Sequence, residues 1–259
     1  MKTRRELKNE VKETFKGHWG QAIKVAIIPI IFQIIIIMLG ILAVMILSII
    51  VAEYSDSISN GISSVDTSNK FGHGNVFGNS AGGIIATMIL TGISFTFLDW
   101  LRTKNADFSA LKGAFSVFTK RNFLGILVLY ILTNIFIFLW TLLLIVPGII
   151  KSFAYSQTYF VYKDMSQSKN ADDFNFLDYI TKSRELMVGH KFEFFVLKLS
   201  FIGWDIVAIL TLGLGYIWVT PYKLATYAAY YKSLAANSDI ISDNQQNDDD
   251  EKKSVIVEY

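Results

Sequence analysis

Cysteine is absent from this 259-residue chain, which excludes disulfide bonds, thiolate nucleophiles, cysteine-bound zinc and iron–sulfur clusters. Charged residues are also scarce, because Asp, Glu, Lys and Arg make up 18% of the sequence against about 25% in soluble proteins. The deficit is concentrated in long uncharged runs. With a hydrophobic content of 52% and a mean hydropathy of +0.40, the composition excludes an ordinary water-soluble domain and indicates a membrane protein.

Motifs of familiar enzymes are absent as well. The sequence has no Gly-x-x-x-x-Gly-Lys-Ser/Thr phosphate loop, no Gly-x-Ser-x-Gly elbow and no His-Glu-x-x-His zinc motif. Its three histidines, His18, His73 and His190, do not show the spacing of a metal site. We therefore expect no enzymatic activity, no cofactor and no metal.

Six uncharged or nearly uncharged segments are long enough to be read as membrane crossings. The first is too long for the apolar region of a secretory signal and is not followed by a cleavage site. The fourth has only 14 residues and contains Lys151, so a short tilted span and a re-entrant arm both remain open; Pro147-Gly148 is expected to stop the helix before it. The segments are 25–51, 81–98, 123–146, 149–162, 192–212 and 216–234.

Lys and Arg are distributed unevenly between the loops. Nineteen lie in residues 1–24, 99–122, 163–191 and the tail, whereas the other loops contain only Lys70. Because basic loops are retained in the cytoplasm, both termini are predicted to be cytoplasmic. We predict one membrane domain over residues 1–235 with a flexible outer loop at 52–80, followed by an acidic disordered tail at 236–259.

A threefold pattern accompanies these crossings. Each basic stretch that precedes a predicted hairpin has an apolar helical face, as expected for a helix at the bilayer interface. The sequence thus predicts an all-α fold of three hairpins, each preceded by a cytoplasmic amphipathic helix; the alternative is that basic flanks recur without any repeat. The three faces comprise Leu7, Val11, Phe15 and Trp19; Phe108, Leu111, Phe115 and Phe118; and Phe176, Ile180 and Met187.

Two sets of candidate functional residues follow from this topology. Asp205 and Lys223 are each nine residues from Leu214, at the centre of the last hairpin turn. In antiparallel helices both would lie about 13.5 Å below the turn, near the middle of a ~30 Å hydrocarbon core, where they are expected to form an ion pair or to line a wet cavity. The candidate contacts for anionic lipid headgroups are Arg4, Arg5, Lys8, Lys12 and Lys16.

Several longer motifs resemble a known family. They are Arg5-Glu6-Leu7-Lys8 with Phe15-Lys16-Gly17-His18-Trp19-Gly20, the run from Val146 to Ser156, Ser183 to Lys191, Leu199 to Trp204, and Thr220-Pro221-Tyr222 with Thr226 and Tyr230-Tyr231. Together they resemble the integral membrane proteins catalogued as domain-of-unknown-function family 975, found in Gram-positive bacteria. The resemblance implies a polytopic plasma-membrane protein of a one-membrane bacterium and supplies no catalytic residues.

Two classes of function remain. The first is a non-enzymatic scaffold, regulator or accessory factor of the cell envelope, favoured by the missing catalytic motifs and by the basic amphipathic helices. The alternative is a transporter of a small solute or lipid, favoured by ionisable residues within the fifth and sixth segments. The expected partners are the lipid bilayer, with its anionic headgroups, and other membrane proteins; no nucleic-acid partner is expected.

Overall fold

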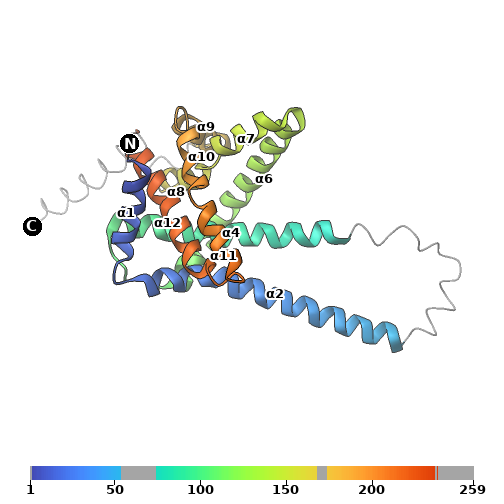
Figure 1. The fold of residues 1–259 in the computed structure, drawn as a ribbon. Helices are drawn as coiled ribbons and strands as arrows, with labels where there is room; N and C mark the ends of the chain where they lie inside the picture. The colour runs from blue at the N-terminus through green and yellow to red at the C-terminus, as the bar shows by residue number, and fades with distance from the viewer. Residues whose placement is uncertain (1, 54–73, 168–173, 237, 239–259) are drawn as a thin grey trace, which may run out of the picture.

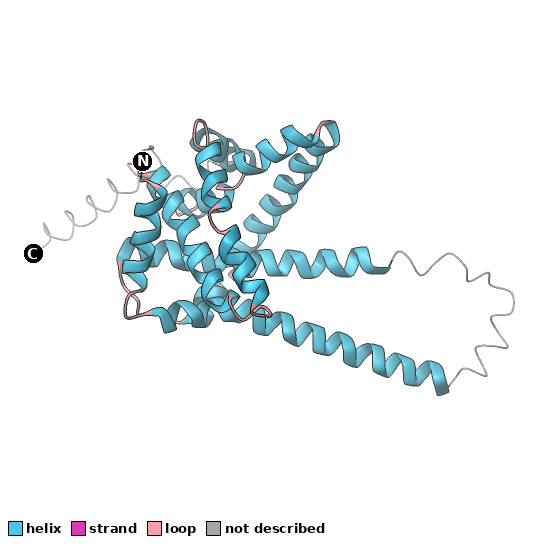
Figure 2. Ribbon diagram, viewed as in Figure 1, coloured by secondary structure: helices cyan, strands magenta, loops and turns pink. Residues whose placement is uncertain are grey.

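The computed structural model describes residues 2–53, 74–167, 174–236 and 238. Helices connected by short turns make up this part of the chain, and no strand occurs in it, in agreement with the predicted all-α class (Figure 2). The helices are α1 (Arg4–Phe15), α2 (Trp19–Glu53), α4 (Gly74–Thr103), α5 (Ala110–Ala114), the 3-10 helix η1 (Ser116–Phe118), α6 (Lys120–Leu143), α7 (Ile145–Ala154), α8 (Thr158–Met165), α9 (Phe176–Leu186), α10 (Lys191–Leu199), α11 (Ile202–Leu210) and α12 (Tyr216–Ala235) (Figure 1).

Two helical stretches are long and apolar enough to cross a membrane in the described part of the chain. They are Gly83–Thr103 within α4 and Asn122–Leu143 within α6; the apolar stretches described in α2 are shorter, Trp19–Ile28 and Met38–Ile50. The two long stretches differ in their surroundings, since 61% of the α4 stretch is buried against 17% of the α6 stretch. Helix α4 therefore belongs to the protein core, whereas α6 presents most of its apolar surface outwards.

Two of the predicted crossings are not continuous helices. Segment 149–162 is divided between α7 and α8, and segment 192–212 is divided between α10 and α11. A serine hydroxyl lies at each break and donates to a backbone carbonyl three residues earlier, from Ser156 to Phe153 at 2.7 Å and from Ser200 to Leu197 at 2.6 Å. Each bond satisfies a carbonyl in the last turn of the preceding helix, and the hydropathy of an apolar run does not indicate where such a helix ends.

The turn before α7 is also placed differently from the prediction. Pro147-Gly148 was expected to reverse the chain, but the reversal occurs at Leu144, whose backbone is extended, and Pro147 lies in the first turn of α7. Proline is tolerated there because the first turn needs no backbone N–H donor. Gly148 permits close packing of the hairpin, since an added Cβ would lie 2.8 Å from the Cα of Thr141.

The predicted outer loop is shorter than expected. Residues 52–53 continue α2, and residues 74–80 already belong to α4. Residues 54–73 lie outside the described part of the chain, as does most of the predicted tail at 236–259.

Three consecutive groups of helices form the bundle, and we call them modules. Module one is α1, α2 and α4; module two is α5, η1, α6, α7 and α8; module three is α9, α10, α11 and α12. Helix α5 packs on α2 and α4, α9 packs on α6 and α8, and α1 packs on α12. Each short amphipathic helix thus contacts the hairpin of another module, and the contact of α1 with α12 joins the first module to the last (Figure 1).

The chain turns in the same way after two of the amphipathic helices. Gly17 follows α1 with φ +80°, and Gly189 follows α9 with φ +78°. An added Cβ would meet nothing within 4 Å at either position, so the left-handed backbone rather than space favours glycine there. The matching turns support the interpretation of the sequence as a repeat.

The apolar faces of the amphipathic helices are covered to different extents. Leu7, Val11 and Phe15 of α1 have no exposed surface, because α12 and α4 cover them. In the second stretch Leu111 remains 63% exposed, as a face toward lipid would be, and the short helices bury Ala114 and Val117. The third face is mainly buried, with Phe176 at its edge. Helix α1 is therefore docked on protein along the side that was expected to face lipid.

Candidate functional site

Asp164 at the end of α8 is the most highly bonded carboxylate in the described residues. Its side chain is 3% exposed and accepts two hydrogen bonds from the Arg102 guanidinium of α4, at 2.8 and 2.7 Å. It also accepts a 2.7 Å hydrogen bond from the hydroxyl of Tyr231 in α12. One carboxylate thus connects the second hairpin arms of all three modules, and we call Arg102, Asp164 and Tyr231 the central triad.

A second ion pair lies beside the central triad. Lys163 is 6% exposed, and its Nζ bonds the carboxylate of Asp99, which is 60% exposed. The same ammonium donates to the carbonyl of Phe95 at 3.2 Å. Lys163 therefore places a buried ammonium group against a carboxylate that still contacts solvent.

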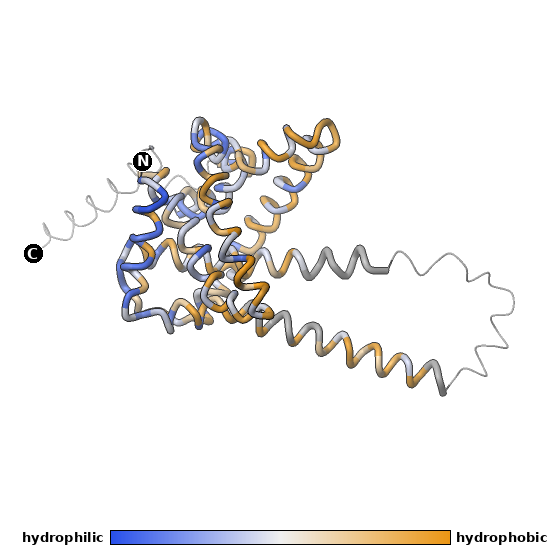
Figure 3. Tube along the Cα trace, viewed as in Figure 1, coloured by the Kyte–Doolittle hydropathy of each residue, from blue (hydrophilic) through white to orange (hydrophobic). Residues whose placement is uncertain are grey.

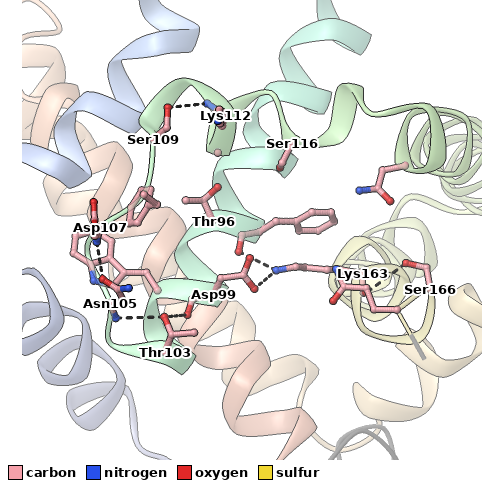
Figure 4. Close-up of a pocket in the computed structure, with 16 residues that line it drawn as sticks. Thr96, Asp99, Thr103, Asn105, Asp107, Ser109, Lys112, Ser116, Lys163 and Ser166 are labelled. Carbon is pink, nitrogen blue, oxygen red and sulfur yellow. Dashed lines mark hydrogen bonds and ion pairs between the residues drawn. The ribbon is translucent and has the colours of Figure 1, made fainter. Parts of the chain in front are cut away.

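This ion pair lies at the edge of a cavity of about 450 Å³, which is within the usual range for small-molecule pockets. Figure 4 shows its polar lining, with Asp99 and Lys163 on one side and Ser109, Lys112 and Ser116 on another. The Ser116 hydroxyl oxygen is buried and has no hydrogen-bond partner. Residues at the end of α4, in the loop 104–109, in α5 and η1, and at the end of α8 line the cavity.

The three inner helices α4, α8 and α12 share a sequence pattern that the sequence analysis did not include. In this pattern a threonine is followed directly by an aromatic residue, and a second aromatic residue follows three positions after the first. The pattern occurs at Thr96, Thr158 and Thr226. All three threonines are buried, and each hydroxyl donates to a carbonyl of its own helix or turn. The pattern was detectable from sequence alone, and it would have identified the helices that meet at the core.

The chemistry available at this site is limited. The described residues hold no group of three His, Asp or Glu side chains placed to bind a metal ion. Three donors already occupy the carboxylate of Asp164. What the arrangement does is join helices through charge-assisted hydrogen bonds, which are the stronger class.

The sequence model of one family, described as protein of unknown function (DUF975), matches residues 1–179 and 142–238. The chain belongs to this family. The two matches overlap and together extend from residue 1 to residue 238, so the helices of all three modules lie within them. No curated protein and no solved structure matches the chain. The family description of DUF975 assigns no activity.

Asp205 and Lys223, the predicted pair of this DUF975 chain, lie next to each other in the structure. The Lys223 Nζ is 2.7 Å from Oδ2 and 3.1 Å from Oδ1 of Asp205. Both side chains are half-buried, at 30% and 25% exposure. Helices α11 and α12 pack side by side around the turn at Leu212-Gly213, where both residues have positive φ. The position of this pair within a bilayer stays a prediction.

The candidate lipid contacts divide into two kinds. Lys8 is half-buried, with its Nζ 4.4 Å above the Phe201 ring and 3.4 Å from the carbonyl of Ser200. The other four are exposed and remain available to an outside partner. We call these four the basic rim: Arg4, Arg5, Lys12 and Lys16.

Glu10 connects α1 with α12. Its carboxylate accepts hydrogen bonds from Lys2 at 2.8 Å and Lys232 at 2.9 Å, and Lys104 lies 3.9 Å away. Partial burial tends to raise the pKa of Glu10, but the hydrogen bonds from Lys2 and Lys232 outweigh burial and lower this pKa. Charge-assisted hydrogen bonds to Glu10 therefore help to hold α1 against α12.

His18 and His190 make local contacts rather than a shared site. The Nδ1 of His18 is 3.3 Å from the carbonyl of Lys16, and the Nδ1 of His190 is 3.4 Å from the carboxylate of Glu193. His73 lies outside the described residues.

Proposed function

We propose that this chain is a multi-pass membrane protein of the cell envelope that acts as a non-enzymatic scaffold, regulator or accessory factor. The observation that carries the proposal is the central triad. Its buried carboxylate accepts three hydrogen bonds, all from groups of the same chain on two other helices, as in a structural joint.

The outer surface supports a membrane setting. Large apolar side chains on α2, α6, α7 and α11 remain half to three-quarters exposed, among them Val44 at 67%, Leu142 at 75% and Leu210 at 77%. Contiguous apolar surface on this scale is costly in water, and a bilayer would solvate it. Hydrophilic residues gather instead around α1, away from the projecting parts of α6 and α7 (Figure 3).

The expected orientation, with both termini in the cytoplasm of a bacterial cell, draws further support from contacts between the basic stretches. Lys104 donates to the Thr14 hydroxyl at 2.9 Å, which joins stretch 99–122 to stretch 1–24. Arg102 and Asp164 join stretch 99–122 to stretch 163–191. Stretches that contact one another are expected on one side of the membrane, as the distribution of Lys and Arg predicts.

Fusions of a reporter that is active only outside the membrane test this topology. A reporter inserted at Asn69 is expected to be active, and reporters at Asn105, Asn170 or the C-terminus are expected to be silent. Matched fusions to a reporter that is active only in the cytoplasm should give the reverse pattern. Activity of the outside reporter at Asn170 would remove one crossing between Asn105 and Asn170 and overturn the six-crossing arrangement.

A transporter of a small solute or lipid is the second candidate. A cavity of about 160 Å³ between α4, α8, α10 and α12, which contains the side chain of Gln157, favours it. A transporter must open such a cavity to water, whereas a scaffold has no need to do so.

Because the chain lacks cysteine, one introduced thiol reports on a single site. Thr91→Cys and Ser156→Cys, both on the cavity wall, are expected to react with charged thiol reagents from one side of the membrane at most, in intact vesicles or in inverted vesicles but not in both. Exposed Asn105→Cys is the positive control and should react in inverted vesicles alone. Reaction of the cavity thiols from both sides of the membrane would favour transport and count against the scaffold.

A further inference from the structure

The cavity of about 160 Å³ lies where helices of all three modules meet, and none of its wall residues belongs to the central triad. Its wall combines aromatic rings with polar groups from four helices and one turn. At this size it exceeds the ~10–15 Å³ that one water molecule needs and is smaller than the ~300 Å³ of a drug-sized pocket. The wall is formed by Thr91, Ser94, Phe95, Ser156, Gln157, Tyr159, Phe160, Phe194, Lys198 and Tyr227.

Gln157 presents an unused acceptor in this wall. The residue is 1% exposed, and its Oε1 has no hydrogen-bond partner. The Ser156 hydroxyl donates its proton to Phe153 O at 2.7 Å, so it can only accept from the amide Nε2 of Gln157, which lies 3.0 Å away. This fixes the orientation of the amide. A buried acceptor without a donor is costly, and a ligand with an N–H or O–H group would remove the cost.

Lys198 provides a cation in the same wall. Its Nζ lies 4.8 Å from the ring centroid of Phe194, 5.2 Å from that of Phe153 and 5.9 Å from that of Tyr227. It forms no ion pair within the described part of the chain, whereas Lys223 is paired with Asp205. The rings stabilise the ammonium partially, and its N–H donors remain free for an anion.

The hydroxyls of α4 have little capacity to donate to a ligand. Thr91 donates to Thr87 O and Ser94 donates to Leu90 O, both at 2.8 Å. Their remaining lone pairs can only accept. The cavity therefore combines one ammonium with several acceptors.

We propose that this cavity binds a small solute or headgroup that carries an anionic group, phosphate or carboxylate, together with ammonium or hydroxyl donors. Lys198 pairs with the anionic group. Gln157 Oε1 accepts from the donor, and Thr91 and Ser94 supply further acceptors. This site is independent of the proposed scaffold role, because it uses no residue of the central triad.

Titration calorimetry on the full chain in detergent tests the site, with O-phosphoethanolamine and glycine as probes. The unsubstituted protein is expected to bind both saturably and to bind ethanolamine, which lacks the anion, much more weakly. Lys198→Gln should weaken binding at least about tenfold, as expected for loss of a charge-assisted hydrogen bond. Lys151→Gln is the matched control, because Lys151 also lies over an aromatic ring, 4.4 Å from the centroid of Trp140, but does not line the cavity; it should leave affinity unchanged.

Gln157→Leu separates the two halves of the site. This substitution should weaken the binding of O-phosphoethanolamine and should leave any binding of sulfate, an anion without hydrogen-bond donors, unaltered. The site is overturned if neither zwitterion binds saturably, or if Lys198→Gln behaves like Lys151→Gln. Should Lys198→Gln fail to fold, Gln157→Leu decides, and unchanged affinity for O-phosphoethanolamine in that variant rejects the proposal.

A further measurement distinguishes the two sources of the ligand. Protein in phosphatidylethanolamine nanodiscs is compared with protein in phosphatidylcholine nanodiscs, because the choline headgroup has no N–H or O–H donor. Loss of O-phosphoethanolamine binding in the former alone supports the site with a lipid headgroup as its ligand. Equal binding in both supports the site with a free solute as its ligand.

Discussion

Replacing Asp164 by Asn should destabilise the bundle more than any surface charge change. The substitution removes the acceptor charge that faces Arg102 and weakens the bond from the Tyr231 hydroxyl. Removing one partner of a buried ion pair costs about 3–5 kcal/mol. Because the Arg102 side chain keeps 28% exposure, water offsets part of this loss, and we take the lower end, about 3 kcal/mol. The weakened bond of Tyr231 adds about 1 kcal/mol.

The assay is thermal unfolding of detergent-solubilised protein, and the measured quantity is the fraction of protein that remains monodisperse. A loss of about 4 kcal/mol corresponds to a fall in Tm of roughly 8–16 °C at the rate of about 2–4 °C per kcal/mol for large domains. Glu185→Gln is the matched control. It breaks the 3.5 Å pair with Lys182, in which the Glu185 side chain is 60% exposed, and surface pairs of this kind contribute about 0–1 kcal/mol.

A double substitution completes the test. Arg102→Gln together with Asp164→Asn removes both charges and leaves side chains that can still bond each other. The double variant should be more stable than Asp164→Asn alone, because no unpaired charge remains. If Asp164→Asn lowers Tm no more than Glu185→Gln does, or if the effects of the two substitutions simply add, the interpretation of the triad as a joint is refuted.

Three further predictions concern the other charged groups. Asp205→Asn and Lys223→Gln should each reduce the folded yield in detergent more than the double substitution does, and simple additivity would exclude a coupled pair. The folded pKa of Glu10 is lowered below its ordinary 4.5, so its stabilising effect is present above the unfolded value and is lost as pH falls through the folded one. As pH falls below about 4.5, the unsubstituted protein should therefore lose more stability than Glu10→Gln, and parallel stability curves would contradict this. Substitution of all four basic-rim residues by Gln should reduce the anionic lipid that co-purifies with the protein, measured by mass spectrometry, because each surface cation contributes about 1 kcal/mol to lipid binding. Lys8→Gln should change the amount of lipid little, because Lys8 is half-buried over the Phe201 ring.

The sequence predicted the helices well where one physical signal dominates. Uncharged runs predicted α2, α4 and α6, a nearly uncharged run predicted α12, and the Gly213 turn between α11 and α12 was expected from its length. The breaks at Ser156 and Ser200 were missed, because the hydropathy of an apolar run does not indicate where its backbone hydrogen-bond ladder is interrupted. The reversal at Leu144 was missed because proline was read as a stop rather than as a first-turn residue.

The site was harder to predict than the fold. Asp205 and Lys223 were placed together because a two-helix hairpin fixes relative depth by counting residues. Arg102, Asp164 and Tyr231 come from three modules, and no count along the chain fixes distances between modules. Charges near the helix ends were counted for orientation, and this count does not show which of them pair inside the bundle.

The docking of α1 on α12 has a consequence for how the protein is made. Helix α1 leaves the ribosome well before α12, which covers Leu7, Val11 and Phe15 together with α4. At about 5–20 residues per second, the roughly 220 residues between them take about 10–45 s. During that interval the apolar face of α1 needs another cover, and a basic amphipathic helix binds a bilayer surface reversibly. Helix α1 is thus suited to two successive surfaces, lipid before α12 has been made and protein afterwards.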